Sequence, residues 1–405
     1  MIRLKYVVDI FGRIGFRGYT EQDLVDENEG AITLSPSNIQ NMKMDYSKCS
    51  FLTWQKYYES PEIKIKNGDV LFVKTGSTYG KVGYVENLPM EATINPQLVV
   101  FKNISMNSKL LFYMLQMSFV KDQCELAVVG GTIPTMSQVK IGNIYIPFPS
   151  LVEQQRIAEF LDRECGKIDG LKADIQAQID TLEQYKRSVI TEAVTHGLNP
   201  SAPMKDSGIP WVGKTPEYWK VGRIGGLYEL RNQKVSDKDF MPLSVTMKGI
   251  LPQLETAAKT NDGDNRKLVR MGDFAINSRS DRRGSCGISD YDGSVSLINT
   301  ILKPRNRMNA KYYNWLFHTP MFADEFYKWG HGIVDDLWTT NWSEMKRISI
   351  PLPPLDEQQE IADYLDNKCA EIEQIIADKK SQIETLDGYK KSLIYEYVTG
   401  KKEVG

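Results

Sequence analysis

The stretch that decides the fold occurs twice. Residues Ile146 to Thr195 read IPFPSLVEQQRIAEFLDRECGKIDGLKADIQAQIDTLEQYKRSVITEAVT, and residues Ile350 to Thr399 read IPLPPLDEQQEIADYLDNKCAEIEQIIADKKSQIETLDGYKKSLIYEYVT. The two copies are 204 positions apart without a gap, and 26 of 50 positions are identical. Such a repeat indicates that one structural unit is used twice in the chain.

Each copy begins with a signal for a helix start. Ser150 and Glu153 have the spacing of a capping box, in which each side chain covers a free backbone N–H of the first turn. Pro354 replaces Ser150 in the second copy, and proline is tolerated in a first helical turn. No further proline occurs before Pro200 in the first copy. The sequence therefore predicts two unbroken helices of roughly 60 Å at 1.5 Å per residue.

Apolar residues in both predicted helices recur every seven positions, which is typical of paired helices. The recurring positions are Ile168, Ile175, Leu182 and Val189 in the first helix, and Ile372, Leu386 and Leu393 in the second, where Lys379 interrupts the series. We expect the stripe to be widened by Leu171, Tyr185, Ile375 and Tyr389. Because a compact domain separates the helices along the chain, we predict that they pair antiparallel.

The segments around the helices also resemble each other. Gly68-Asp69-Val70-Leu71-Phe72 aligns with Gly272-Asp273-Phe274-Ala275-Ile276 at the same offset, and both precede a polar loop and a β-branched strand pattern. The predicted class is α+β, with two mixed α/β domains joined by two long antiparallel coiled-coil helices in a pseudo-two-fold repeat. The predicted segments are a first domain at 1–149, a central helix at 150–197, a second domain at 198–350, and a C-terminal helix and tail at 351–405.

Composition limits the function further. Hydrophobic residues make up 41% and charged residues 25%, which is ordinary for a globular chain, and no apolar run has the roughly 20 residues of a membrane span. The five cysteines are far apart and predict buried thiols in the cytoplasm. Net charge is +1 in 1–149 and +5 in 198–350, but −3 in 150–197 and −5 in 351–405. The positive charge therefore lies in the globular segments, which is where nucleic acid would bind.

These residues resemble a known family. The twin P-x-P-x-L-x-E-Q-Q-x-I-A-x-(F/Y)-L-D motifs, and the segment Ser207 to Trp219, are similar to those of specificity subunits of Type I restriction-modification systems. The resemblance implies a DNA-binding subunit without catalysis of its own. It implies that each domain reads one half of a split, asymmetric double-stranded target and that the helix pair sets the gap.

The resemblance also implies the partners. Two adenine methyltransferase subunits would dock on the chain, and motor-nuclease subunits would join for cleavage. S-adenosylmethionine, ATP and Mg would belong to these partners, and this chain would hold no cofactor or metal. The residues expected to contact the methyltransferases lie near the two helix starts: Gln154, Gln155, Ile157, Gln358, Gln359 and Ile361.

Motifs for catalysis within the chain are weak. Gly76 and Gly80 enclose three residues where a phosphate-binding P-loop needs four, and Val82 follows Lys81 where that loop needs Ser or Thr. Asp45 with Glu62-Ile63-Lys64 has a loose nuclease-like spacing, and a solvated loop is the favoured interpretation. The alternative functions are a coiled-coil assembly scaffold without sequence readout and a self-sufficient enzyme.

The candidates for DNA contact follow the Gly-Asp strand of each domain. Arginine suits guanine, asparagine suits adenine, and lysine suits phosphate. The candidates of the first domain are Lys74, Thr75, Ser77, Thr78, Tyr79 and Lys81. Those of the second domain are Ser244, Thr246, Lys248, Asn277, Arg279, Ser280, Arg282 and Arg283.

Overall fold

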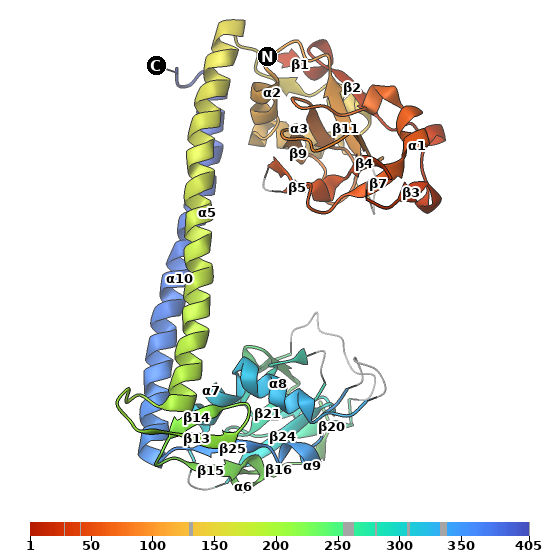
Figure 1. Cartoon of the computed structure of the whole chain (residues 1–405). Coiled ribbons are helices and arrows are strands. Elements are labelled where there is room, and N and C mark those ends of the chain that lie inside the picture. The colour runs from red at the N-terminus through yellow and green to blue at the C-terminus, as the bar shows by residue number, and fades with distance from the viewer. Residues whose placement is uncertain are drawn as a thin grey trace. The chain divides into compact units, whose positions relative to one another are not determined.

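The computed structural model describes residues 1–27, 29–40, 42–128, 133–253, 263–279, 282–305, 308–332 and 338–404. The chain forms two compact units (Figure 1). Unit 1 is Met1–Ile175 with Lys380–Gly405, and unit 2 is Gln176–Lys379. Each unit thus combines a globular domain with part of both long helices, α5 (Leu151–His196) and α10 (Leu355–Val398). The mixed helix and strand content and the two long helices confirm the predicted fold class.

Unit 1 contains two four-stranded sheets, of order β2-β11-β8-β9 and β10-β4-β7-β3, and two short strand pairs, β1-β12 and β5-β6. Its strands are β1 Ile2–Arg3, β2 Asp9–Gly12, β3 Leu24–Val25, β4 Gly30–Leu34, β5 Ile39–Gln40, β6 Lys43–Met44, β7 Ser50–Thr53, β8 Val70–Val73, β9 Val82–Tyr84, β10 Ala92–Ile94, β11 Leu98–Lys102 and β12 Tyr145–Ile146. Its shorter helices are α1 Trp54–Tyr58, α2 Ser108–Met114, α3 Ser118–Ala127 and α4 Gln138–Gly142, with 3-10 turns at Leu4–Tyr6, Gly15–Arg17, Glu21–Asp23, Pro36–Asn38 and Pro61–Ile63.

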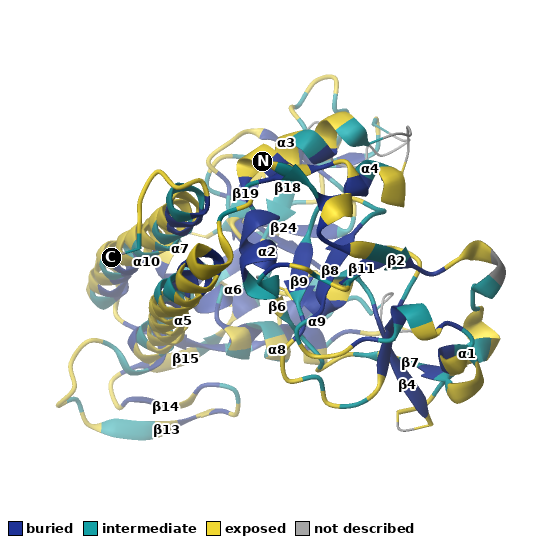
Figure 2. Cartoon of the chain, turned by 90° about the horizontal axis from the view of Figure 1, so that it is seen from above, coloured by how far each residue is buried: buried dark blue, intermediate teal, exposed yellow. Residues whose placement is uncertain are grey.

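The central sheet of unit 1 is covered on both faces. Successive strand residues point to opposite sides, so Val70 and Phe72 of β8 join the core with α2, whereas Leu71 and Val73 join the core with β4. Strand β11 divides in the same way between the two cores. Both strands consist mainly of fully buried residues, drawn dark blue in Figure 2. This double burial explains why the sequence there is a continuous apolar run rather than an alternating one.

Unit 2 repeats the central sheet with the order β16-β24-β21-β22, beside β17-β20-β23, β13-β14, β15-β25 and β18-β19. Its strands are β13 Met204–Ile209, β14 Gly213–Pro216, β15 Lys220–Arg223, β16 Tyr228–Leu230, β17 Lys234–Val235, β18 Leu243–Thr246, β19 Gly249–Pro252, β20 Arg266–Val269, β21 Phe274–Asn277, β22 Cys286–Ile288, β23 Gly293–Val295, β24 Asn299–Pro304 and β25 Ser349–Leu352. Its shorter helices are α6 Ile224–Leu227, α7 Ala310–Phe317, α8 Pro320–Lys328 and α9 Trp342–Met345.

One glycine recurs because a hairpin packs closely against it in both units, with side chains in unit 1 and with the backbone in unit 2. A Cβ on Gly83 of β9 would lie 2.8 Å from Met44 Sδ, and a Cβ on Gly287 of β22 would lie 2.8 Å from the Cα of Gly249. The two glycines are 204 positions apart. In each unit a small hairpin, β5-β6 or β18-β19, therefore packs directly on the strand that follows the polar loop.

The long helices pair antiparallel within each unit, as predicted. In unit 1, Lys172 of α5 pairs with Asp387 of α10 and Lys390 with Asp169. In unit 2, Lys186 of α5 lies against Glu373 of α10. From Asp169 to Lys172 the residue number rises in α5, while that of the partner falls from Lys390 to Asp387 in α10. The helices therefore run in opposite directions (Figure 1).

Part of the predicted stripe is wrong. Leu171, Tyr185, Ile375 and Tyr389 are all exposed. The contact seam advances by four residues after Ile168, to Lys172, and α10 likewise uses Ile376 rather than Ile375. Lysines are accommodated in the seam because their aliphatic stems pack while their ammonium groups pair with carboxylates of the other helix.

All five cysteines are free thiols, four of them buried and Cys49 half-buried. Burial raises the pKa of the Cys124 and Cys165 thiols to about 11. In the part of the chain that is described, no group of three or more His, Cys, Asp and Glu side chains is arranged to hold a metal ion. No helix among these residues is long and apolar enough to cross a membrane.

Candidate nucleic-acid interface

The two predicted DNA-contact loops have the same backbone frame. Loop 1 is residues 74–81, after β8, and loop 2 is residues 278–285, after β21. Val73 N–H donates to Lys81 O at 2.9 Å, and Asn277 N–H donates to Ser285 O at 2.8 Å. Inside the loops, the N–H of Lys81 donates to Thr78 O and that of Ser285 to Arg282 O. These donors and acceptors correspond at an offset of 204, so one loop frame is built twice.

Each loop also bridges to a later segment of its own domain. Thr75 pairs with Thr135, and Arg279 pairs with Thr339, again 204 positions apart. Gly80 and Gly284 close the loops with φ of +79° and +74°, a conformation that favours glycine. The frame is therefore the same for the described residues of both loops, while their side chains differ.

Loop 1 presents a small polar surface. Ser77 and Thr78 are exposed, whereas Lys74, Thr75, Tyr79 and Lys81 are half-buried. Burial lowers the pKa of the Lys74 ammonium. Tyr79 packs against the core and Lys81 donates to Pro36 O at 3.4 Å, so these two side chains also support the loop.

Loop 2 presents arginines. Arg279 is half-buried, and its guanidinium has no ion-pair partner among the described residues. Arg282 and Arg283 are exposed. Arg283 Nη1 lies 2.9 Å from Asp324 Oδ1, and its guanidinium lies over the Tyr327 ring. Ser280 lies outside the described residues.

Asn277 does not fit the prediction of direct base contact. Its side chain is buried, and its Oδ1 accepts from the backbone N–H of Arg279 at 3.0 Å. Its carbonyl accepts from the Tyr327 hydroxyl at 3.1 Å. Asn277 therefore supports loop 2 and does not present an amide to a base edge.

The remaining candidates of the second domain lie on the β18-β19 hairpin. Ser244 and Thr246 are half-buried and Lys248 is exposed at the turn. The Thr246 hydroxyl donates to Gly249 O at 2.9 Å and accepts from the N–H of Lys248 at 3.1 Å, so it shapes the turn. This hairpin packs on β22, and loop 2 connects β21 to β22. The hairpin that carries Lys248 is therefore a neighbour of the strand that follows loop 2.

The predicted partner-contact residues are mostly internal. Gln154, Ile157, Gln358 and Ile361 are buried, so for these four the prediction of a partner surface is wrong. Gln154 Oε1 accepts from the N–H of Asn107 at 2.9 Å, and its Nε2 donates to Pro149 O at 3.0 Å. The twin glutamine motif therefore joins each long helix to its own domain.

Gln155 and Gln359 are exposed, yet they take part in the same junction. Gln155 Oε1 accepts from Asn107 Nδ2 at 2.8 Å. In unit 2, Gln358 Oε1 accepts from the N–H of Asn309 at 2.9 Å, and Gln359 Oε1 accepts from Asn309 Nδ2 at 2.7 Å. Both hydrogen bonds that join Asn107 to the glutamines of α5 thus have a counterpart in unit 2.

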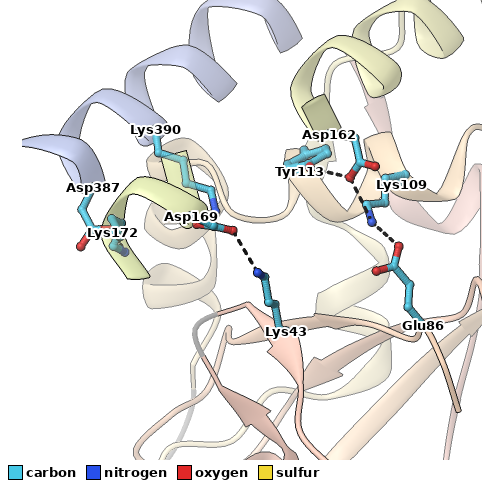
Figure 3. A network of polar contacts seen from close by, with 9 residues as sticks. All are labelled: Lys43, Glu86, Lys109, Tyr113, Asp162, Asp169, Lys172, Asp387 and Lys390. Carbon is cyan, nitrogen blue, oxygen red and sulfur yellow. Dashed lines mark hydrogen bonds and ion pairs between the residues drawn. The ribbon is translucent and has the colours of Figure 1, made fainter. Parts of the chain in front are cut away.

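A second contact repeats two turns further along each helix. Asp162 of α5 accepts from the Tyr113 hydroxyl at 3.1 Å and lies 3.1 Å from Lys109 Nζ (Figure 3). Asp366 of α10 accepts from Trp315 Nε1 at 2.9 Å and lies 2.8 Å from Lys311 Nζ. The sequence carries a signal that could have identified these residues, because Met106-Asn107-Ser108-Lys109 recurs as Met308-Asn309-Ala310-Lys311.

The architecture defines a repeat protein that presents one polar loop frame twice, each copy on a mixed α/β domain attached to a long helix. A family model described as the Type I restriction modification DNA specificity domain matches residues 19–181 and 216–385. The chain belongs to this family, which confirms the resemblance seen in its twin motifs.

Individual relatives agree with this assignment. The chain is 25% identical over 365 residues to the Type I restriction enzyme MjaVIII specificity subunit of Methanocaldococcus jannaschii, covering 85% of this chain and 81% of the relative. It is 28% identical over 347 residues to the StySPI specificity subunit of Salmonella potsdam, covering 80% and 72%. A chain solved in work on complex assembly and conformational transition of the type I R-M system has a TM-score of 0.70 at 16% identity, covering 99% of this chain and 97% of that one. This structure shares the fold.

Proposed function

We propose that the chain is the DNA-sequence specificity subunit of a Type I restriction-modification complex, in which each domain reads one half of a bipartite target. The observation that carries the proposal is the loop frame built twice with different side chains. Loop 1 offers hydroxyls and lysines, and loop 2 offers arginines. Two readers with one frame and unlike side chains would bind two unlike half-sites, so the target is asymmetric.

The helix pair would dock two methyltransferase subunits. Exposed apolar side chains support this, because they recur 204 positions apart: Leu171 with Ile375, and Tyr185 with Tyr389. Unit 1 therefore exposes Leu171 and Tyr389, and unit 2 exposes Ile375 and Tyr185. Exposed apolar groups mark interaction surfaces, and a repeated surface offers one partner type two equivalent sites. Gln155 and Gln359 remain candidates for the edge of this surface.

The chain would position its partners without performing chemistry itself. In this proposal the methyltransferase subunits hold S-adenosylmethionine and extrude an adenine from each half-site. ATP and Mg belong to motor-nuclease subunits, and the complex acts in the cytoplasm. Methylation or cleavage by the purified chain alone would contradict this assignment.

The test is selection from random duplex DNA by the complex of the full chain with its methyltransferase, followed by sequencing. We expect one enriched motif with two different half-sites and a fixed gap, and a complex mass with two methyltransferases per chain. A coiled-coil scaffold without readout predicts a stable complex and no enriched motif. A complex that saturates with one methyltransferase would contradict the two-site proposal.

A further inference from the structure

The contacts between each domain and its long helix form two equivalent clamps. Clamp 1 joins α2 to α5 in unit 1 through Asn107, Lys109, Tyr113, Gln154, Gln155 and Asp162. Clamp 2 joins α7 to α10 in unit 2 through Asn309, Lys311, Trp315, Gln358, Gln359 and Asp366. The two domains differ strongly in sequence, yet their attachment to the helices is nearly the same.

Each clamp restricts the angle between the domain and its long helix. The amide of Gln154 is buried, and both of its ends are bonded, to Asn107 and to Pro149. Asn107 is also bonded at both ends, since its Oδ1 accepts from the N–H of Leu110 and caps α2. A second contact at Asp162, two turns along α5, prevents rotation about the first, because two separated points fix a direction.

The clamp is mechanically connected to the DNA-contact loop. Helix α2 packs with Val70 and Phe72 of β8 in one core, and loop 1 follows β8 directly. In unit 2, α7 packs with Phe274 and Ile276 of β21 in the same way, before loop 2. A change in the angle between α2 and α5 therefore moves loop 1 with the whole domain.

We propose that the two asparagine–glutamine clamps fix the angle at which each domain is held on its helix and thereby determine which gap between half-sites the complex accepts. This inference rests on the proposed function. One base pair changes the separation of half-sites by about 3.4 Å and also rotates one half-site around the duplex axis. A domain that is held at a fixed angle on its helix cannot adjust to the new position of its half-site, whereas a domain on a loosened clamp can.

Selective variants exist because the glutamines join the long helix to the asparagine, whereas the asparagine also caps α2 or α7 through its Oδ1. The double variant Gln154→Ala with Gln155→Ala removes both hydrogen bonds of α5 to Asn107 and leaves the cap of α2 in place. Gln358→Ala with Gln359→Ala does the same in clamp 2. The matched control is Gln176→Ala, because Gln176 bonds Asp180 one turn along α5 as Gln155 bonds Glu159, and no contact of its side chain with a domain is present among the described residues.

The experiment measures kcat/KM for methylation by the complex of full chain and methyltransferase. The substrates are the selected target with its own gap and with gaps one base pair shorter and longer. For the wild type and the control we expect the altered gaps to be methylated about 100-fold more slowly, since a 1 Å misplacement of reacting groups has an effect of that size. For either double variant we expect this preference to fall to about tenfold or less, with unchanged half-site bases.

The outcomes are distinguishable. A folded double variant with the gap preference of the wild type overturns the clamp proposal. If a double variant unfolds early in a thermal melt, the single variant Gln155→Ala, at an exposed position, decides. Its gap preference must then be weaker than that of the wild type and of the control, and a preference equal to theirs overturns the clamp proposal. A wild-type complex that methylates no bipartite target overturns the proposed function itself, and the clamp proposal with it.

Discussion

Lys390 of α10 lies with its Nζ 2.7 Å from Asp169 Oδ1 of α5, and its side chain is only 6% exposed. The pair has a counterpart 204 positions away, where Lys186 of α5 contacts Glu373 of α10 in unit 2. The counterpart is more exposed to solvent, since the Glu373 side chain is 64% exposed. Asp169 is also approached by Lys43 of the β6 strand at 3.7 Å (Figure 3). The same ion pair is thus buried in unit 1 and open in unit 2.

This difference predicts unequal effects of the same substitution. Lys390→Met keeps the packing of the stem but leaves Asp169 largely buried with only the more distant Lys43, so we expect a loss of about 3 kcal/mol in the free energy of unfolding. Lys186→Met leaves an exposed carboxylate and should cost less than about 1 kcal/mol. Denaturant unfolding of the two variants measures both values. Equal losses would mean that burial of the pair does not determine its contribution.

The arginines of loop 2 should differ in their contribution to DNA recognition. Arg279 has no ion-pair partner among the described residues, whereas Arg283 already pairs with Asp324. We therefore expect Arg279→Ala to weaken binding of the second half-site by about 1–3 kcal/mol and Arg283→Ala to weaken it less. Filter binding or gel shift with targets altered in either half measures the loss of affinity for each half-site.

The control for these variants is Arg270→Ala, in the same domain but outside loop 2 and paired with Asp292. It should leave the discrimination between correct and altered half-sites unchanged. If Arg279→Ala weakens binding to random DNA as much as to the target, Arg279 contacts phosphate and does not read a base.

A buried histidine predicts a pH dependence of stability in unit 2. Burial lowers the pKa of His318 below its ordinary value of 6.5, and its Nδ1 donates to Asn314 O at 2.7 Å. Below pH 6.5 the unfolded chain takes up a proton that the folded chain resists, so stability is complete above pH 6.5 and is lost as the pH falls toward the lowered pKa. The slope from this one group is up to about 1.4 kcal/mol per pH unit.

The substitution His318→Gln should remove this part of the slope. Denaturant unfolding between pH 7.5 and pH 5, at roughly half-unit steps, compares it with the wild type and cancels the carboxylates that both share. Parallel curves for the two proteins would show that His318 protonates equally well in the folded chain.

The length of the helix pair should determine the gap between half-sites. Insertion of seven residues into both helices, after Ile175 and after Lys379, adds about 10.5 Å and nearly preserves the contacting face. These positions coincide with the limits of units 1 and 2, so both units stay intact. Since DNA rises about 3.4 Å per base pair, we expect the methylated gap to grow by about three base pairs while both half-sites persist. An assembled, active variant with an unchanged gap would refute this role of the helices.

The sequence predicted the architecture because the repeat and the seven-residue period are properties of the chain itself. It assigned Leu171 and Tyr185 to the wrong face, since hydrophobicity alone does not reveal that Lys172 and Lys186 lie in the seam and pair across it. Which residues enter the seam depends on the carboxylates that the other helix places opposite them. This register of the two helices is known only from the three-dimensional structure.

The site was predicted less completely for a similar reason. The polar loops were identified from their position after a repeated strand, and the shared frame of loops 1 and 2 agrees with that repeat. The burial of Gln154 was not foreseeable, because its donor Asn107 lies 47 positions away in the sequence. The side chain of Asn277 bonds locally to the N–H of Arg279, but its carbonyl accepts from Tyr327, 50 positions away. A polar residue in a motif can stabilise the fold as readily as it can bind a partner.

If this chain alone chooses a bipartite, asymmetric DNA target for a methyltransferase partner, an exchange of one loop must alter one half of that target. The most direct measurement is a genome-wide map of methylated adenines in cells that contain the methyltransferase with the wild-type chain, or with loop 2 replaced by the residues of loop 1. We expect one motif of two unlike half-sites for the wild type, and loss or change of one half-site only for the exchanged chain. Methylation without a motif, or a motif that the exchange leaves unaltered in both halves, would contradict this expectation.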